Sequence, residues 1–276
     1  MDGMDTNVTI RAESPSSVHR GAVFVYGIAA YVVGVGALVA LILIMLGVVR
    51  FTGGPLRDLG LGGALALDSL LLLTFALQHS VMARPSFKAR WTRVIPPAAE
   101  RSTYVLATGL VLAPLLALWQ PMPAIVWSVQ APMARWLLLG IALAGWAYLL
   151  AASFAINHFE LFGLRQVFEF LRGRPITRTP FKERWMYRLD RHPIMTGVLV
   201  GMWVTPTMTV DHLLFAAGST VYVCIGVHFE ERSLVRQLGL PYEDYRKRVR
   251  TIVPTFTSRR SKPPVSVAPD STPECP

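Results

Sequence analysis

Residues with useful acid–base or ion-pairing chemistry in this chain lie at the ends of long apolar runs. Seven of them are the candidates for a functional site: His79, Arg101, His158, Arg191, His192, Glu230 and Glu231. Histidine accepts and releases protons near neutral pH. Two adjacent carboxylates at the end of an apolar run are costly unless a cation or several hydrogen-bond donors meet them. The pattern therefore indicates a site for a polar or charged ligand, with groups that can move a proton.

Each of these polar residues, taken alone, also has a plainer interpretation. Residues at a membrane boundary are often polar because they meet water and lipid head groups, and loop arginines often report topology. His79 and His158 could form a metal pair, because imidazole binds zinc and iron. No histidines are spaced i and i+4 on one helix, so the sequence favours no metal site.

The composition identifies the class of protein. Of 276 residues, 53% are hydrophobic and only 16% are charged, yet the net charge is +10. Soluble chains carry about a quarter charged residues. A chain that is both apolar and basic is not typical of a soluble nucleic-acid-binding protein, so we expect an integral membrane protein with no nucleic-acid partner. Cys224 and Cys275 support neither a disulfide framework nor a cysteine zinc site.

The apolar runs predict an all-α, polytopic membrane bundle of about five to six transmembrane helices. A helix needs about 20 apolar residues to cross a bilayer. Four runs qualify, at residues 21–49, 62–83, 102–119 and 134–156. Residues 194–229 form two apolar helices broken at Pro206 and Asp211. This hairpin either crosses twice or penetrates partly, and we expect it to cross.

The basic residues predict the orientation. Lys and Arg favour the cytoplasmic side of short loops. With six spans and an inside N-terminus, 24 of the 27 lie inside, so both termini are expected in the cytoplasm. Trp119, Trp127 and Trp136 are expected to anchor the outer interface. Residues 1–20 and 257–276 read as disordered tails around a membrane domain at 21–256.

The C-terminal third holds the densest group of motifs. Residues 184–193 end in Arg191-His192-Pro193, and Pro193 suits the first turn of a helix. An apolar hairpin separates this motif from Glu230-Glu231. Residues 238–248 then predict a short interfacial helix after a Gly-Leu-Pro turn, with Tyr242 and Tyr245 one turn apart.

This order of motifs resembles the isoprenylcysteine carboxyl methyltransferase superfamily of membrane methyltransferases. Upstream, residues 77–85, 100–106 and 157–166 look like the bacterial methanethiol S-methyltransferases, a group close to the NnrU-like membrane proteins. The resemblance covers about residues 22–255. It implies methyl transfer from S-adenosylmethionine to methanethiol, which releases dimethyl sulfide, in the bacterial inner membrane with the active site facing the cytoplasm.

The resemblance also implies site residues. The cofactor region is expected at 157–250. Cofactor-binding residues carried over by motif, with their immediate neighbours, are Tyr187, Arg191, His192, Pro193, Ile194, Glu230 and Glu231. Two positions depart from the pattern. Met195 replaces a usual tyrosine, and Gly226 replaces the arginine that grips substrate in the prenylcysteine enzymes, which favours a small neutral thiol.

Methyl transfer to a thiol is faster from the thiolate, so a base or a cation near the sulfur would help. His79 and His158 are the candidate bases, and Arg101 is the candidate stabiliser of the thiolate. Three other functions stay open: a phospholipid or isoprenylcysteine methyltransferase, an NADPH-dependent membrane reductase, and a non-enzymatic NnrU-like protein or transporter. The oligomeric state stays open too.

Overall fold

The chain is a helical membrane protein, as the apolar runs predict. The computed structural model describes residues 16–56, 59–176, 183 and 185–252. Five helices are long and apolar enough to span a membrane. They are α1 (Ser17–Met45), α2 (Gly60–Ala83), α4 (Glu100–Leu118), α5 (Pro132–Ile156) and α9 (Val210–Leu238).

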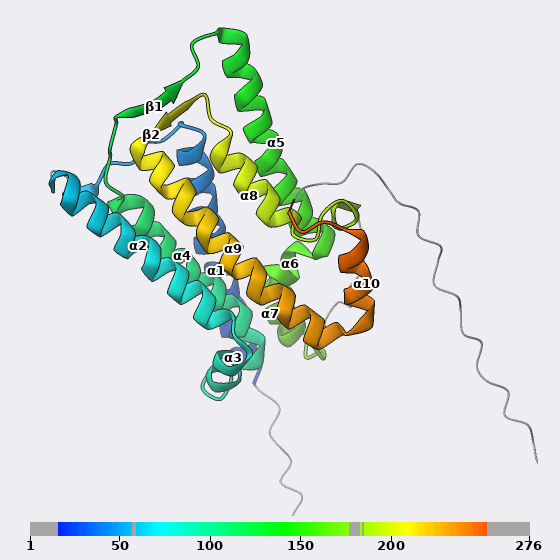
Figure 1. The fold of residues 1–276 in the computed structure, drawn as a ribbon. Coiled ribbons are helices and arrows are strands. Elements are labelled where there is room, and N and C mark those ends of the chain that lie inside the picture. The colour runs from blue at the N-terminus through cyan, green and yellow to red at the C-terminus, as the bar shows by residue number, and fades with distance from the viewer. Residues whose placement is uncertain (1–15, 57–58, 177–182, 184, 253–276) are drawn as a thin grey trace, which may run out of the picture.

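Short elements connect and flank the long helices (Figure 1). The helices are α3 (Pro85–Trp91), α6 (His158–Leu161), α7 (Leu164–Leu171), α8 (Pro193–Trp203) and α10 (Leu240–Arg248). Three 3-10 turns are η1 (Gly54–Leu56), η2 (Pro97–Ala99) and η3 (Trp185–Arg188). Two strands are β1 (Ile125–Ser128) and β2 (Thr207–Thr209).

The ends of α2, α4 and α5 lie within two residues of the predicted runs, whereas α1 begins and ends four residues earlier than the run 21–49. α1 begins at Ser17, where the Ser16 hydroxyl accepts a hydrogen bond from the His19 backbone N–H. The predicted tail therefore extends too far by four residues, 17–20. The rest of that tail and the whole C-terminal tail lie outside the described residues.

The predicted hairpin is broken where expected, but its two arms are unequal. α8 has 11 residues, or about 16 Å of helix, which is too short to cross a bilayer alone. Trp203, the last residue of α8, donates a hydrogen bond of 2.8 Å to Thr220, well inside α9. Residues 204–206 then carry the chain onward to β2. Whether the hairpin crosses twice stays a prediction.

β1 and β2 form a small antiparallel sheet that the sequence did not predict. Ile125 pairs with Thr209, and Ser128 pairs with Thr207. The sheet closes the end of the bundle opposite α3, α7 and α10 (Figure 1). It therefore joins the loop after α4 to the turn between α8 and α9.

One of the predicted interfacial tryptophans is instead part of the core. Trp119 is fully buried, packs against Phe215 with ring centroids 5.1 Å apart, and donates to the Asp211 carbonyl. Trp127 and Trp136 are exposed, as an interfacial position requires. Asp68, on α2, is also fully buried and accepts a hydrogen bond of 2.8 Å from the Gln120 backbone N–H. This bond and the burial of Trp119 fix the end of α4 at Leu118.

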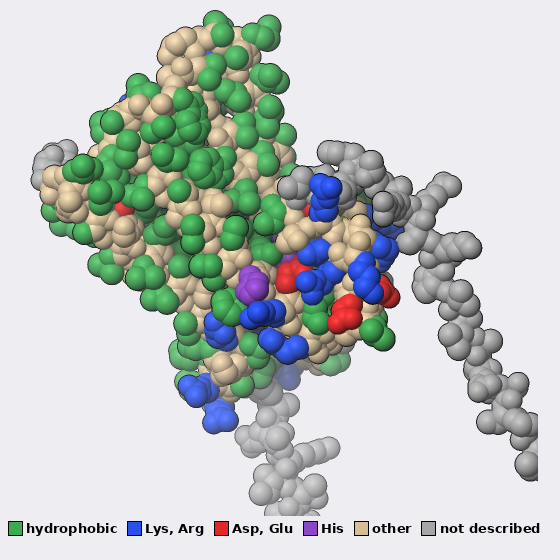
Figure 2. Space-filling view, in the orientation of Figure 1, with side chains coloured by type: hydrophobic (Ala, Val, Ile, Leu, Met, Phe, Trp, Pro, Cys, Tyr) green, Lys and Arg blue, Asp and Glu red, His purple; other side chains and the backbone are tan. Residues whose placement is uncertain are grey.

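The surface divides by polarity along the bundle (Figure 2). Hydrophobic side chains cover the long helices, while Lys, Arg, Asp, Glu and His gather toward the end with α3 and α10. An apolar surface that covers the long helices is suited to contact with lipid tails.

The close approach of α5 and α8 requires glycine. A Cβ at Gly197 would lie 2.6 Å from the Gly145 carbonyl oxygen, and a Cβ at Gly201 would lie 2.3 Å from the Trp146 ring. Small residues let helix backbones pack closely within a membrane. This contact therefore sets the place of α8, and with it the start of the helix at Pro193.

We expect Gly197→Ala to destabilise the protein by about 1–3 kcal/mol, because the new methyl meets backbone that cannot yield. Thermal unfolding in detergent measures this. Gly140→Ala on α5 is the matched control, because a Cβ at Gly140 meets nothing within 4 Å. Equal melting temperatures for the two variants would contradict the close packing.

Candidate active site

The motifs of the C-terminal third come together at one end of the bundle. α10 folds back on α9, with Tyr242, Tyr245 and Val249 buried against Leu234, Val235 and Leu238. Gly239 makes the turn between the two helices with a φ of 62°, which glycine adopts without strain. The segment after α10 then lies along residues 190–192, since the Arg191 N–H donates to the Arg250 carbonyl at 2.8 Å.

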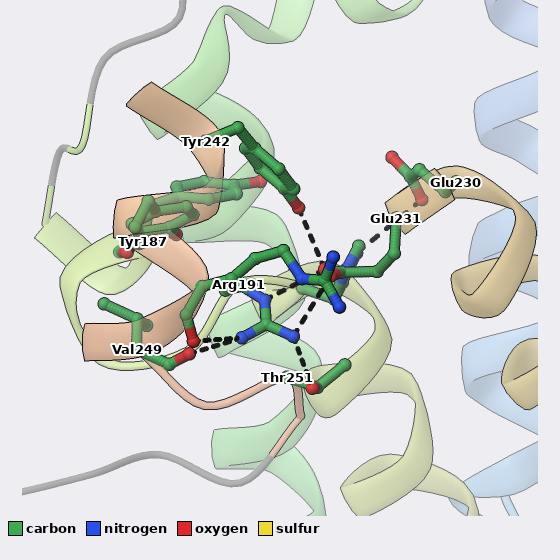
Figure 3. Close-up of polar contacts among 10 residues, drawn as sticks. Tyr187, Arg191, Glu230, Glu231, Tyr242, Val249 and Thr251 are labelled. Atoms are coloured by element: carbon green, nitrogen blue, oxygen red, sulfur yellow. Dashed lines mark hydrogen bonds and ion pairs between the residues drawn. The ribbon is translucent and has the colours of Figure 1, made fainter. Parts of the chain in front are cut away.

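Glu231 is the centre of this arrangement (Figure 3). Its carboxylate, 9% exposed, receives hydrogen bonds from His192 at 2.7 Å and Tyr242 at 2.8 Å. Arg191 binds both of its oxygens, at 2.9 and 3.1 Å. Arg246 lies 3.0 Å from Oε2. A carboxylate has about four lone-pair sites, so Glu231 is fully used by the protein.

Arg191 is equally saturated. Besides Glu231, its guanidinium donates to the Arg246 and Val249 carbonyls at 3.0 and 2.5 Å and to the Thr251 hydroxyl at 2.7 Å. These five bonds use all five guanidinium N–H donors. Arg191 and Glu231 therefore hold the start of α8, the end of α9, α10 and the following segment together.

Glu230, the adjacent acid, has a different environment. Its side chain is 52% exposed, and its nearest charged partner is His192 Nδ1 at 3.6 Å, beyond hydrogen-bond distance. In Figure 3 Glu230 lies at the edge of the cluster, and one dashed line, its contact with His192, joins it to the other residues. In the described part of the chain it makes no hydrogen bond that satisfies its oxygens, so Glu230 is the acid that has capacity for a ligand.

The other predicted cofactor residues surround this cluster. Tyr187 is buried, its carbonyl accepts the Tyr245 hydroxyl at 2.5 Å, and burial raises the pKa of its phenol. Glu230 interacts electrostatically with Tyr187. Pro193 is buried in the first turn of α8, and Ile194 packs against the main core. These two residues position the helix rather than offer polar groups.

A shallow hollow of about 320 Å³ lies beside the cluster. Its walls are Arg191, Cys224, Val227, His228, Glu231, Arg246, Thr251 and Ile252. Glu230 is not among them. The hollow and the free acid therefore lie on different sides of α9.

His79 lies between α2 and α4. Its Nδ1 is 3.1 Å from the Thr108 hydroxyl, and its Nε2 is 2.7 Å from the Tyr104 hydroxyl. Arg101 lies over the Tyr104 ring at 5.7 Å. The structure thus brings two of the predicted catalytic residues, His79 and Arg101, to the same tyrosine.

His158 belongs to a separate group at the junction of α1, α5 and α6. It is buried, with Nε2 2.9 Å from the Tyr31 hydroxyl and Nδ1 2.9 Å from the Ser153 hydroxyl. Its ring stacks on Phe154 at 4.4 Å. Burial lowers the pKa of His158, so it is uncharged at neutral pH.

The two histidines bind different hydroxyl groups and do not meet as a metal pair. Among the described residues, no three His, Cys, Asp or Glu side chains are grouped so that they could hold a metal ion.

The chain is similar in sequence to known methyltransferases. The chain is 49% identical over 194 residues to a methanethiol S-methyltransferase of Mycobacterium tuberculosis, covering 70% of this chain and 80% of the relative. It is 42% identical over 240 residues to methanethiol S-methyltransferase 1 of Bradyrhizobium diazoefficiens, covering 87% of this chain and 84% of the relative.

The chain belongs to the methanethiol S-methyltransferase family. A more distant relative is Nurim of Rattus norvegicus, 30% identical over 207 residues, covering 69% of this chain and 79% of Nurim. No family model matches the chain, and no solved structure matches it. Membership of the methanethiol S-methyltransferase family confirms the resemblance inferred from the motifs.

The sequence did not identify two parts of the site in this family member. Tyr104, which joins His79 to Arg101, is not among the candidate residues named from the sequence. Arg246 was not singled out, although it binds Glu231. The i, i+3 and i, i+4 spacing of Arg101, Tyr104 and Thr108 on one helix is the signal that would have grouped them with a partner.

We expect Glu231→Ala to cost about 3–5 kcal/mol of folding stability, because it leaves the buried Arg191 guanidinium without its partner. Unfolding in detergent, followed by circular dichroism, measures the loss. Asp244→Ala is the matched control, since the Lys247–Asp244 pair is 74% and 66% exposed and contributes little. A Glu231 variant as stable as this control would show that the cluster is not structural.

The burial of Asp190 predicts that the stability of the protein depends on pH. It is fully buried and accepts the Tyr148 hydroxyl at 2.9 Å, yet burial outweighs this bond and raises its pKa from 3.8 to about 6. The unfolded chain releases the proton near pH 3.8, while the folded protein keeps it until about 6. Wild-type stability from this residue therefore falls as pH rises through that window.

Asp190→Asn removes this titration while keeping an amide of similar shape. We expect the variant to gain stability relative to wild type between about pH 4 and 6, measured as the difference in melting temperature across pH. A difference that stays constant over this range would contradict the raised pKa.

Proposed function

We propose that this chain transfers a methyl group from S-adenosylmethionine to methanethiol and releases dimethyl sulfide. The observation that carries this proposal is the 49% identity to a methanethiol S-methyltransferase across most of both chains. The methyl donor is the more specific part of the proposal. It rests on the Arg-His-Pro and Glu-Glu motifs and on the different environments of the two glutamates.

The residues present suit a cationic donor that carries hydroxyl and amino groups. Glu230 is the carboxylate with free capacity, and hydrogen bonds to an ionised acid are strong. His192 lies beside it, with Nδ1 3.6 Å from the Glu230 carboxylate. We therefore assign cofactor binding to Glu230, and we assign Glu231 and Arg191 to holding the site in shape. S-adenosylmethionine supplies a methyl group already activated on a sulfonium.

The acceptor is proposed to be small and uncharged. The position of the substrate-gripping arginine in the resembling prenylcysteine enzymes is Gly226, where a Cβ would meet nothing within 4 Å. A carboxylate-bearing acceptor has no cation at that position. Methanethiol dissolves in lipid, and the helices of this membrane protein give it a route through the bilayer.

We also propose that the charged end of the bundle faces the cytoplasm in a bacterial inner membrane. Arg84, Lys88, Arg101 and Arg191 lie at that end, opposite the β1–β2 sheet. The positive-inside preference supports this orientation. It gives Glu230 access to a water-soluble donor.

The test is headspace gas chromatography of cells that express the chain and receive methanethiol. We expect wild type to release dimethyl sulfide and Glu230→Gln to lose at least about 100-fold of this activity, because a neutral amide binds the donor less well. Titration of purified protein with S-adenosylmethionine should show weaker binding by Glu230→Gln. Asp244→Asn, on exposed α10 surface, is the matched control.

Two results would reject the proposal. Folded wild-type protein in the membrane that releases no dimethyl sulfide would reject the reaction. Binding of NADPH in place of S-adenosylmethionine would reject the donor and favour a membrane reductase.

A further inference from the structure

His79 cannot meet a substrate directly in this structure, because both of its ring nitrogens are already engaged. Thr108 occupies Nδ1 and Tyr104 occupies Nε2. Any proton that reaches His79 from a ligand must therefore pass through one of these two hydroxyl groups.

The hydrogen-bond network fixes which nitrogen carries the proton. The Thr108 hydroxyl donates its only hydrogen to the Tyr104 backbone carbonyl at 2.8 Å, so it accepts from His79 Nδ1–H. A neutral imidazole protonated at Nδ1 has a lone pair at Nε2. Nε2 consequently accepts the Tyr104 hydroxyl hydrogen, over a short 2.7 Å contact.

This leaves the Tyr104 oxygen with a lone pair for another donor. Its hydrogen is committed to His79, and within the described residues no other group donates to it. Tyr104 is partly exposed, and the Arg101 guanidinium lies over its ring at 5.7 Å.

Contacts with α9 place the Tyr104–His79 pair on the same side of the bundle as the proposed methyl-donor site. The His79 ring lies 6.3 Å from the Tyr222 ring on α9, edge to face. Arg84, which follows α2, lies 5.3 Å from the centre of the Phe229 ring, and Phe229 is the neighbour of Glu230. The pair therefore lies at the junction of α2, α4 and α9.

We propose that Tyr104 is the catalytic residue that takes the proton from the thiol and that His79 receives the Tyr104 proton in the same step. This inference rests on the proposed function. The thiol S–H bond breaks and its proton goes to the Tyr104 oxygen, while the phenol proton goes to His79 Nε2. The thiolate electron pair forms the new S–CH₃ bond, and the donor's sulfonium–methyl bond breaks with its electron pair left on the donor sulfur. After the product leaves, His79 returns the proton to the Tyr104 oxygen, and Tyr104 releases a proton to water.

A similar arrangement elsewhere in the chain gives an internal comparison. The Ser153 hydroxyl donates to the Leu150 carbonyl at 2.6 Å, so His158 Nδ1–H donates to Ser153 and Nε2 accepts from Tyr31. This second pair is enclosed by Phe154 and Phe162 at the junction of α1, α5 and α6. Its place away from the α2–α4–α9 junction is why we assign the proton transfer to Tyr104.

The experiment compares Tyr104→Phe and Tyr31→Phe in membranes, with methanethiol and methaneselenol as acceptors. General-base catalysis contributes about 10²–10⁴-fold, so Tyr104→Phe should lower kcat/KM for methanethiol by at least about 100-fold at neutral pH. The loss should shrink as pH rises and ionises the thiol in water. Methaneselenol is more acidic and already ionised, so the variant should methylate it at nearly the wild-type rate.

The charged and titratable groups around Tyr104 bear on that pH profile. They are Glu100 and Arg101 on α4, His79 on α2, and Tyr222 and Glu230 on α9. His79→Gln keeps a hydrogen-bond acceptor for Tyr104 but no base. It should show the same dependence on pH and on the acceptor, which a residue that only supports packing would not show.

Tyr26→Phe is the matched control for both comparisons. It removes a different tyrosine hydrogen bond, 2.8 Å to Thr103 on α4, without touching His79, so it should keep the wild-type rate with both acceptors.

Three outcomes overturn the inference while leaving the proposed function intact. One is wild-type activity in a folded Tyr104→Phe protein. Another is an equal loss with methanethiol and methaneselenol. The third is the expected pattern in Tyr31→Phe in place of Tyr104→Phe. A wild-type protein that methylates neither acceptor rejects the proposed function itself, so the two failures are distinguishable.

Discussion

The bidentate contact between Arg191 and Glu231 is the interaction on which the charged end of the bundle depends. Removing two charges from water costs several kcal/mol each, and their attraction offsets this only when the remaining donors and acceptors are also satisfied. Here every N–H of Arg191 has an acceptor, and Glu231 receives His192, Tyr242 and Arg246 as well. The short helix α8 begins where it does because Arg191 is held two residues before it.

The contact between Arg191 and Glu231 also explains why the neighbouring residues Glu230 and Glu231 differ in their exposure and in their partners. Successive residues on a helix point about 100° apart, so Glu230 and Glu231 face different surroundings, and His192 lies beside both only because its two ring nitrogens point in different directions. Once Glu231 is fixed against Arg191, Glu230 turns toward the other side of α9, half exposed and beside His192. An acid that must bind a ligand and release it needs this incomplete set of partners. The saturated acid provides the rigid support.

The predictable part of the structure was the part with a strong local signal. Four of the five long helices follow from runs of apolar residues, and their ends fall within four residues of expectation. The end of α8 at Trp203 lies three residues before the predicted break at Pro206. The extension of α9 from 229 to Leu238 was not predictable from hydropathy, because these residues are largely polar. Trp119 was misplaced for a similar reason, since composition cannot tell an interfacial tryptophan from one buried against Phe215.

The candidate site divides in the same way. The motifs brought Arg191, His192 and the two glutamates to attention, but spacing alone could not say which glutamate is saturated. His79 and Arg101 were chosen for their chemistry. Their connection through Tyr104 depends on helix rotation and on the Thr108 hydroxyl, and neither is visible in a hydropathy pattern.

On the proposed function, the placement of these groups at the edge of the apolar layer has a physical reason. A sulfonium and a thiolate carry opposite charges, and both charges vanish as the methyl group moves. Water stabilises the separated charges, so a drier site raises the energy of the reactants more than that of the transition state. The same dryness makes the thiolate harder to form. A base connected through a neutral tyrosine creates that charge beside the donor, where the sulfonium compensates it at once. A chain with a half-exposed acid on α9 and a hydrogen-bonded Tyr104–His79 pair at the junction of α2, α4 and α9 meets both requirements, because the group that takes the proton from the neutral thiol is itself a neutral phenol.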